Sequence, residues 1–147
     1  MLFTYLSVPM LSKSCEYGLR ATLYLASRND DGYVPISTIS DELDISFAFL
    51  TKILQKLNDA GLLTSQRGPR GGVALTRDAN GVTLYDVVAA IDGEGLFQEC
   101  VLGLPDCGNA EPCPLHEQWV EKRNQMETMF RQATLAELPD VRLTALD

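Results

Sequence analysis

Three cysteines lie close together in a segment rich in glycine and proline, and their spacing could place several thiolates on one centre. Cys100, Cys107 and Cys113 form a C-x6-C-x5-C pattern, and His116 follows three residues later. In a chain expected to be intracellular, clustered thiols indicate metal or redox chemistry rather than structural disulfides. The pattern lacks the close CxxC pairs that zinc sites usually use. An iron–sulfur cluster tolerates wider intervals but usually takes four protein ligands.

Two side chains are candidates for the fourth ligand. His116 lies one helical turn beyond Cys113, whereas Glu16 could approach from an N-terminal helix of either subunit. Cys15 is interpreted as a small buried or half-buried thiol outside the site. From the spacing alone, a metal or cluster site, a disulfide switch between two of the loop cysteines and an inert loop all stay open.

Basic side chains gather in a different part of the chain, between residues 51 and 77. This stretch holds five Lys or Arg and one Asp, although the whole chain has a net charge of −8. Residues 1–77 sum to +1 and residues 78–147 to −9. A local basic patch matters more for phosphate contact than the charge of the whole chain. The balance therefore permits DNA binding by the first half, with the acidic half facing away.

Hydrophobic periodicity and turn residues predict the elements that position these groups. A hairpin is expected from strands 63–67 and 73–77 around a glycine-rich turn, with a loop at 96–112 and one further turn at 134–138. The expected helices span residues 16–28, 38–43, 46–60, 84–91 and 114–133.

Several residues have the types and positions of helix caps. Thr38 with Asp41, and Thr83 with Asp86, have capping-box spacing. Ser46 suits an N-cap, Gly61 the residue after a helix end, and Pro114 the first residue of the last helix.

A short helix, a tight turn, a second helix and a basic hairpin together describe a winged helix-turn-helix. The predicted fold class is therefore mainly α with a small β-hairpin wing. The second helix would enter the major groove, backed by a Leu/Ile stripe, and the wing arginines would suit phosphates or a narrow minor groove. The candidate DNA-contacting residues are Ser46, Thr51, Lys52, Gln55, Lys56, Arg67 and Arg70.

The last predicted helix would be about 30 Å long, too long for a small domain to cover its apolar face. We expect this face to pack on a second subunit, which predicts a homodimer. Its apolar residues are Leu115, Trp119, Met126, Met129, Phe130 and Ala133.

Further features of the sequence indicate its domain organisation and limit its possible functions. Residues 1–9 are interpreted as an N-terminal extension, 10–82 as the DNA-binding domain, and 83–147 as the cluster loop and dimerisation helices. The sequence has no apolar run long enough to span a membrane and no signal peptide, so we expect a cytoplasmic protein. With one histidine, no nucleotide-binding loop and no general-base constellation, it is not expected to be an enzyme.

Several motifs, taken in order, resemble the Rrf-two family of winged helix-turn-helix transcription regulators, and in particular its iron–sulfur (IscR- and NsrR-like) members. The resemblance runs from Met10 onward and includes the cysteine triplet. The matching segments are residues 11–26 (LSKSCEYGLRATLYLA), 45–57 (ISFAFLTKILQKL), 61–63 (GLL), 67–73 (RGPRGGV), 83–92 (TLYDVVAAID) and 134–138 (TLAEL).

The resemblance implies a homodimeric bacterial regulator of a palindromic double-stranded DNA operator, with its affinity set by an iron–sulfur cluster. A 2Fe-2S form is favoured over 4Fe-4S. The family's cysteine ligands correspond to Cys100, Cys107 and Cys113, its IscR-type histidine to His116, and its NsrR-type acidic ligand to Glu16.

This sequence departs from the family pattern at two places. The first cysteine interval is six residues where five is usual, and Thr51 stands where IscR-type proteins have an acidic residue that contacts bases. The alternative function is a cluster-free winged-helix regulator that switches through cysteine thiol or zinc chemistry.

Overall fold

The computed structural model describes residues 10–28, 32–104 and 113–138 of the chain. The predicted N-terminal extension and Cys107 fall outside these residues. The mainly α fold class with a β-hairpin wing is confirmed. In chain order the elements are α1 (Lys13–Ser27), α2 (Ile36–Leu43), α3 (Phe47–Asp59), β1 (Leu63–Gln66), β2 (Gly72–Leu75), η1 (Ala79–Gly81), α4 (Leu84–Asp92), α5 (Gly95–Gln98), α6 (His116–Gln132) and η2 (Leu135–Glu137).

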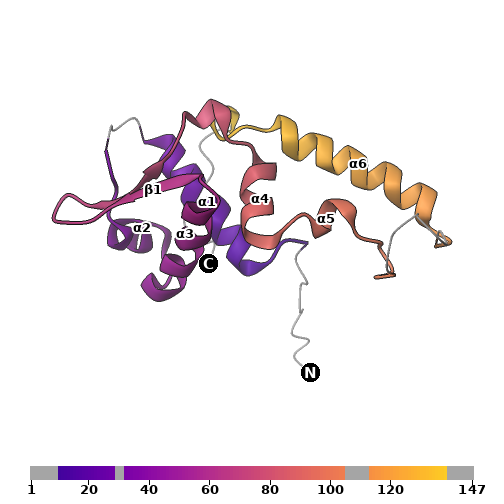
Figure 1. Cartoon of the computed structure of the whole chain (residues 1–147), viewed down its shortest axis with the longest axis horizontal. Helices are drawn as coiled ribbons and strands as arrows, with labels where there is room; N and C mark the ends of the chain where they lie inside the picture. Colours follow the sequence, from indigo (N-terminus) through magenta and orange to yellow (C-terminus); the bar gives the residue numbers. More distant parts are fainter. Residues whose placement is uncertain (1–9, 29–31, 105–112, 139–147) are drawn as a thin grey trace, which may run out of the picture.

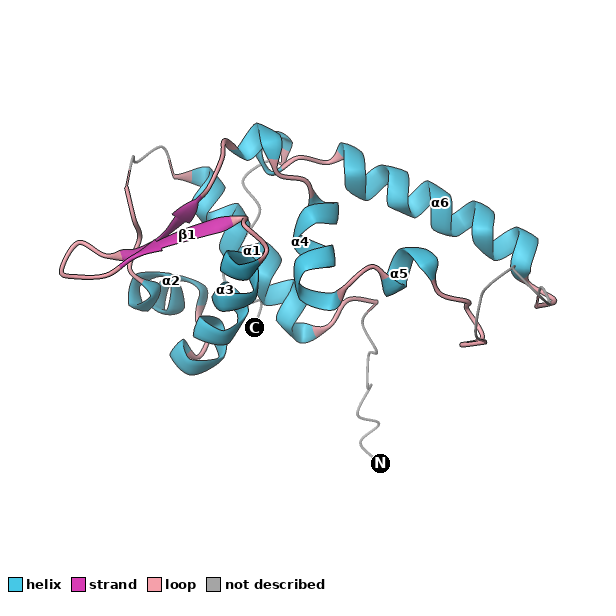
Figure 2. Ribbon diagram, viewed as in Figure 1, coloured by secondary structure: helices cyan, strands magenta, loops and turns pink. Residues whose placement is uncertain are grey.

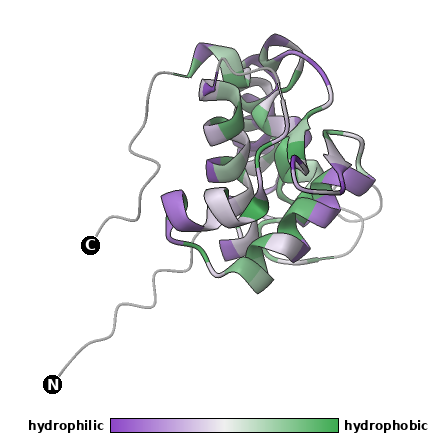
Figure 3. Ribbon diagram, turned by 90° about the vertical axis from the view of Figure 1, so that its left-hand side faces the viewer, coloured by the Kyte–Doolittle hydropathy of each residue, from purple (hydrophilic) through white to green (hydrophobic). Residues whose placement is uncertain are grey.

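The core lies where α1 packs against α3 and α4, with α2 covering one side of α3 (Figure 1). The predicted stripe of α3 is buried there, since Leu50, Ile53, Leu54 and Leu57 are each at most 2% exposed. Viewed from the wing end, single helices carry both hydrophobic and hydrophilic segments (Figure 3), as amphipathic helices do.

Three of the predicted helix caps are confirmed. The Ser46 hydroxyl accepts from the Phe49 N–H at the start of α3, and Thr83 and Asp86 form a reciprocal capping box at the start of α4. Gly61 has a φ of +79° and follows the end of α3. There the Gly61 N–H donates to Asn58 O and the Leu62 N–H to Leu57 O, each at 3.0 Å, which is a Schellman motif.

Three local predictions are wrong. Thr38 lies inside α2, which begins two residues earlier because Pro35 already provides the N-cap backbone conformation. Pro114 is not the first residue of α6. The backbone N–H of His116 donates to Cys113 O and closes a turn there, so the helix begins only at His116. The segment 96–112 is not all loop, since α5 begins at Gly95 and buries Phe97.

The wing is a two-stranded antiparallel hairpin in which Leu63 pairs with Leu75 and Gln66 with Gly72 (Figure 2). Val34 extends it by an isolated bridge to Val73, with both N–H···O distances 2.9 Å. Gly72 has a φ of +151°, and a Cβ there would lie 2.1 Å from Val34 O. Glycine at this position therefore lets the hairpin attach to the helical body.

Helix α6 reaches away from the winged-helix body on the side opposite the wing tip (Figure 1). Its 17 residues correspond to about 26 Å. The chain then returns to the start of α4, where Leu84 N–H donates to Ala133 O and Leu135 N–H to Val82 O, each at 2.9 Å. The predicted turn at 134–138 is confirmed as η2.

Candidate functional site

The predicted DNA-contacting side chains of α3 are all exposed along one side of the helix. Lys52 and Lys56 are exposed, and the polar side chains of Thr51 and Gln55 make hydrogen bonds within the helix. Thr51 Oγ1 donates to Phe47 O at 2.7 Å, and Gln55 Nε2 donates to Asp59 Oδ1 at 2.8 Å. Ser46 is exposed at the N-cap.

Arg67 and Arg70 are exposed on the loop between β1 and β2. This loop lies beside α3, and a groove of about 350 Å³ separates the two. The groove is lined from α3 by Phe47, Thr51 and Gln55, among others, and from the wing side by Gln66 and Gly68. The fold thus brings the exposed face of α3 and the basic hairpin together on one side of the molecule.

The two described cysteines of the predicted site come together. Cys100 follows α5 and Cys113 precedes α6, yet their sulfur atoms are 3.5 Å apart. Both side chains are buried, and no disulfide joins them. The Leu102 N–H also points at Cys100 Sγ, at 3.4 Å. Convergence of two thiols from separate elements is what a shared metal or a redox pair requires.

The two candidates for a fourth ligand lie on different elements. His116 is half-buried at the start of α6, and its backbone N–H donates to Cys113 O at 2.9 Å. Glu16 lies in the first turn of α1, where its carboxylate is 3.5 Å from Lys13 Nζ. Among the described residues, which exclude Cys107, no group of three or more His, Cys, Asp or Glu side chains is arranged to hold a metal ion.

Helix α6 holds the segment that leads into Cys100. Trp119 Nε1 donates to Glu99 O at 2.8 Å. Arg123 donates to Gln98 O at 2.7 Å and to Glu99 O at 3.3 Å. The backbone immediately before the cysteine is therefore fixed to the first two turns of α6.

An aromatic chain continues this connection to α4. Phe97 of α5 lies between Tyr85 of α4 and Phe130 of α6, with ring centroids 4.8 and 5.4 Å away. The Arg131 guanidinium lies 3.7 Å from the Tyr85 ring centroid, and the Tyr85 hydroxyl donates to Glu94. This hydrogen bond, followed by burial, raises the pKa of Tyr85. Since α4 packs on both α1 and α3, the cysteine segment is joined to the winged helix by continuous contacts.

Cys15 is fully buried in α1, as the sequence predicts. Burial, and then the neighbouring Asp92 carboxylate, raises its pKa to about 12. The thiol is therefore protonated at neutral pH, which makes it a poor metal ligand.

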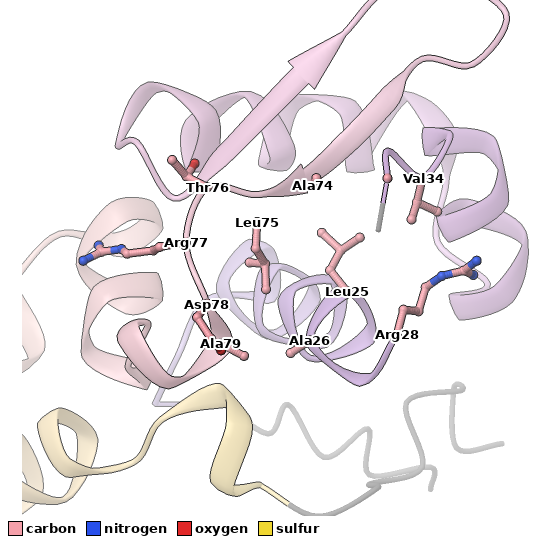
Figure 4. A pocket seen from close by; sticks show the side chains of 11 residues that line it. Leu25, Ala26, Arg28, Val34, Ala74, Leu75, Thr76, Arg77, Asp78 and Ala79 are labelled. Atoms are coloured by element: carbon pink, nitrogen blue, oxygen red, sulfur yellow. The ribbon is translucent and has the colours of Figure 1, made fainter. Parts of the chain in front are cut away.

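A second hollow of about 460 Å³ lies between the end of α1 and the base of the wing (Figure 4). Its lining combines apolar side chains, such as Leu25, Val34 and Leu75, with the more polar segment 76–78. Arg28 and Arg77 flank it on opposite sides, and their guanidinium groups point away from its centre (Figure 4). The guanidinium groups therefore do not converge on a single bound group inside the hollow.

Sequence reasoning missed two features of these surfaces. Trp119 was assigned only to an apolar stripe, but its indole N–H holds the backbone at Glu99. Phe47 was assigned no role, although its side chain is 55% exposed at the start of α3. The exposure of Phe47 could have been predicted, because it is a large apolar residue on the polar side of the predicted recognition helix.

The helix-turn-helix, its exposed polar and cationic face and the adjoining arginine-bearing hairpin define a winged-helix DNA-binding protein. The chain belongs to the Rrf2 family, described as an iron-dependent transcriptional regulator, whose model matches residues 11–140. Family membership makes it a transcription regulator rather than an enzyme. No helix in the described parts of the chain is long and apolar enough to cross a membrane.

Individual relatives agree with this assignment. The HTH-type transcriptional regulator IscR of Photobacterium profundum is 34% identical over 87% of this chain and 74% of its own length. The oxidized form of Staphylococcus aureus CymR has a TM-score of 0.70 at 25% identity, over 89% of this chain and 98% of its own. T. potens IscR also has a TM-score of 0.70, at 24% identity over 86% and 83% of the two chains, and supports the fold.

Proposed function

We propose that this regulator is a homodimer whose affinity for a palindromic DNA operator is set by an iron–sulfur cluster on Cys100, Cys107 and Cys113. The observation that carries the proposal is the 3.5 Å approach of the Cys100 and Cys113 sulfurs, which lie 13 residues apart in sequence. The similarity to IscR of Photobacterium profundum supports it. Redox poise, nitric oxide and cluster supply are the candidate signals.

The donor set fits such a group. Two thiolates bound to one tetrahedral metal ion lie about 3.8 Å apart, whereas a disulfide needs about 2.05 Å. The observed separation is close to the first value. Hydrogen bonds to ligating sulfurs, of the kind that Leu102 N–H makes to Cys100, are part of iron–sulfur sites. Two sulfurs close enough for one iron favour 2Fe-2S over 4Fe-4S.

His116 and Glu16 are the proposed alternatives for the remaining ligand. The backbone hydrogen bond to Cys113 O holds His116 next to a proposed cysteine ligand on the same chain. Glu16 would instead have to leave Lys13, which lies 3.5 Å from its carboxylate. These contacts favour His116.

A conformational change in the cysteine segment would be transmitted to the DNA-binding surface through α6, α5 and α4. When bound, the cluster would supply a redox- or nitric-oxide-sensitive group. Trp119 and Arg123 hold the backbone before Cys100, and Phe97 connects that segment to Tyr85 of α4. Since α4 packs on α1 and α3, a change at the cysteines would alter the position of α3. A coupling of about 1–3 kcal/mol would change operator affinity about 5- to 150-fold.

The proposed dimer contact uses the face of α6 that one chain leaves uncovered. Only Phe130 is buried among the residues of this helix. Met129 is 56% exposed, and Leu115, just before the helix, is 43% exposed. Covering these side chains with a second α6 would remove apolar surface from water. It would also hold two winged helices at the fixed separation that a palindromic operator requires.

The test combines spectroscopy with DNA titration. Anaerobically reconstituted protein should show broad visible absorption and matched iron and sulfide, and its Kd for a selected operator should differ from that of apo protein. Cys100→Ala, Cys107→Ala and Cys113→Ala should each lose the absorption, whereas Cys15→Ala should retain it. Equal holo and apo affinities would refute gating by the cluster. Iron retention in His116→Ala and Glu16→Gln would distinguish the two fourth ligands.

The second candidate is a cluster-free regulator that switches through thiol or zinc chemistry. The same sulfur pair supports it, because 3.5 Å requires little movement to form a disulfide. A solved structure similar to this chain is the oxidized form of S. aureus CymR. Two thiols would lose two electrons and two protons to an oxidant in forming the bond. Protein that stays colourless after reconstitution, with operator affinity that responds to an oxidant or to zinc, would favour this candidate.

A further inference from the structure

An exposed phenylalanine stands at the start of α3. Phe47 is the first residue of this helix, and its side chain is 55% exposed. It lines the groove beside the wing together with Thr51 and Gln55, four and eight residues further along. At this spacing the three side chains share one face of the helix. That face is the one a winged-helix protein presents to the major groove.

The polar groups on this face are engaged within the helix. The Thr51 hydroxyl donates to Phe47 O at 2.7 Å, so the donor of Thr51 is satisfied internally. Gln55 Nε2 donates to Asp59 Oδ1 at 2.8 Å. Beside the exposed Lys52 side chain, the first two turns therefore present apolar groups: the Phe47 ring, the Ala48 methyl and the Thr51 methyl. All three residues are exposed.

The neighbouring Phe49 shows that exposure alone does not identify a contact residue. Phe49 is 36% exposed, but its ring meets Tyr17 of α1 edge-to-face at 5.6 Å. This contact gives Phe49 a role in joining α1 to α3. Phe47 instead lies on the groove side, towards the wing.

Thymine is the base that presents a methyl group in the major groove, and apolar side chains recognise it there. We propose that Phe47, with the Thr51 methyl beside it, contacts thymine C5-methyl groups and contributes to operator specificity. The inference rests on the DNA-binding part of the proposed function but not on the cluster. It assigns Thr51, a DNA-contacting candidate from the sequence, an apolar contact through its methyl group.

The experiment begins with duplexes selected from a random pool by the wild-type protein. Each thymine of the selected half-site is then replaced by uracil, which removes only the methyl group. Wild-type protein should bind one or two of these duplexes about fourfold more weakly, the effect expected for one buried methyl. Phe47→Ala should bind the thymine duplex more weakly than wild type does. Replacing that thymine with uracil should weaken the binding of this variant little or not at all.

Matched variants separate the methyl contact from other effects. Phe47→Leu should keep most of the thymine preference. Thr51→Val should bind like wild type, whereas Thr51→Ser, which keeps the hydroxyl and loses the methyl, should bind more weakly. Lys52→Ala should weaken binding to thymine and uracil duplexes by the same factor. Thermal unfolding checks that each variant is folded.

The possible outcomes distinguish failure of this inference from failure of the proposed function. The inference would be overturned if wild-type protein bound all uracil and thymine duplexes with equal affinity. It would also be overturned if the replacement of thymine by uracil reduced the affinities of wild type and Phe47→Ala by the same factor. The measurements are made with apo and reconstituted protein. A thymine preference in both, with equal affinities, would refute gating by the cluster while supporting the methyl contact.

Discussion

The indole N–H of Trp119 donates to the carbonyl oxygen of Glu99 at 2.8 Å, which joins the long helix α6 to the residue immediately before Cys100. This contact crosses 20 positions of sequence and does not depend on the cysteines themselves. It therefore provides a way to loosen the proposed cluster site without removing a proposed ligand.

Trp119→Phe should keep the aromatic ring and lose the hydrogen bond. A typical hydrogen bond contributes about 1 kcal/mol, so the cysteine segment should open about fivefold more often. Release of iron from reconstituted protein to a chelator should accelerate by about this factor. The difference in operator affinity between holo and apo protein should also shrink. Visible absorbance and DNA titration measure the two effects.

Gln125→Ala is the matched control on α6, because this side chain is exposed. It should release iron at the wild-type rate. If Trp119→Phe also released iron at that rate, the hydrogen bond to Glu99 would have no part in holding the site.

Gly18 of α1 provides a test of how closely α1 and α4 must approach. A Cβ at this position would lie 2.1 Å from Ile91 Cδ1 and 3.3 Å from Ile53 Cγ2. Gly18→Ala gains helix propensity, but overpacking should exceed that gain and leave a net loss of about 1–2 kcal/mol in unfolding free energy. Denaturant unfolding measures it.

Ile91→Val removes the Cδ1 atom that the new methyl would meet. The double variant Gly18→Ala with Ile91→Val should therefore be more stable than the sum of the two single effects predicts. Strictly additive effects would contradict the assignment of the strain to this pair.

The winged helix was predictable because its signals are local. The Leu50, Ile53, Leu54 and Leu57 stripe fixes the buried face of α3, and Ser46 and Gly61 mark its ends by chemistry that needs no distant partner. The start of α2 was missed because Pro35 favoured an earlier beginning than Thr38, although Thr38 has the side chain of a capping residue. Two competing local signals cannot be ranked without the tertiary contacts.

The surroundings of the cysteines were less predictable because they depend on contacts between distant segments. Spacing indicated that Cys100 and Cys113 could converge, but it did not show that Trp119 and Arg123 would hold the intervening backbone. Similarly, the short helix α5 forms where Phe97 packs between Tyr85 and Phe130. Burial against two other helices, rather than helix propensity, stabilises so short an element.

Cys15 should make stability depend on pH in the alkaline range. Its pKa is raised by burial from 9.0 to about 12, so the folded state keeps the proton that the unfolded state loses. The stabilisation is complete below pH 9 and is lost as the pH rises towards 12. One such group changes the unfolding free energy by at most about 1.4 kcal/mol per pH unit. Cys15→Ala should show a smaller decrease between about pH 9 and 11 in urea unfolding.

Tyr85 titrates in a neighbouring range, because its hydrogen bond to Glu94 raises its pKa. The comparison therefore uses the difference between wild type and Cys15→Ala, in which the Tyr85 contribution cancels. Parallel stability curves for the two proteins would show that ionisation of Cys15 does not control alkaline unfolding.

Arg70 at the wing tip should contribute through phosphate or groove-shape contact rather than base recognition. It is exposed on the loop between β1 and β2, beside the groove that separates the wing from α3. Arg70→Ala should weaken binding to every duplex and reduce the slope of log Kd against log salt by about 0.9, the value for one phosphate contact. Lys122→Ala, which removes an exposed cation from α6, should leave that slope unchanged. A change in sequence preference without a change in slope would instead assign Arg70 to base contact.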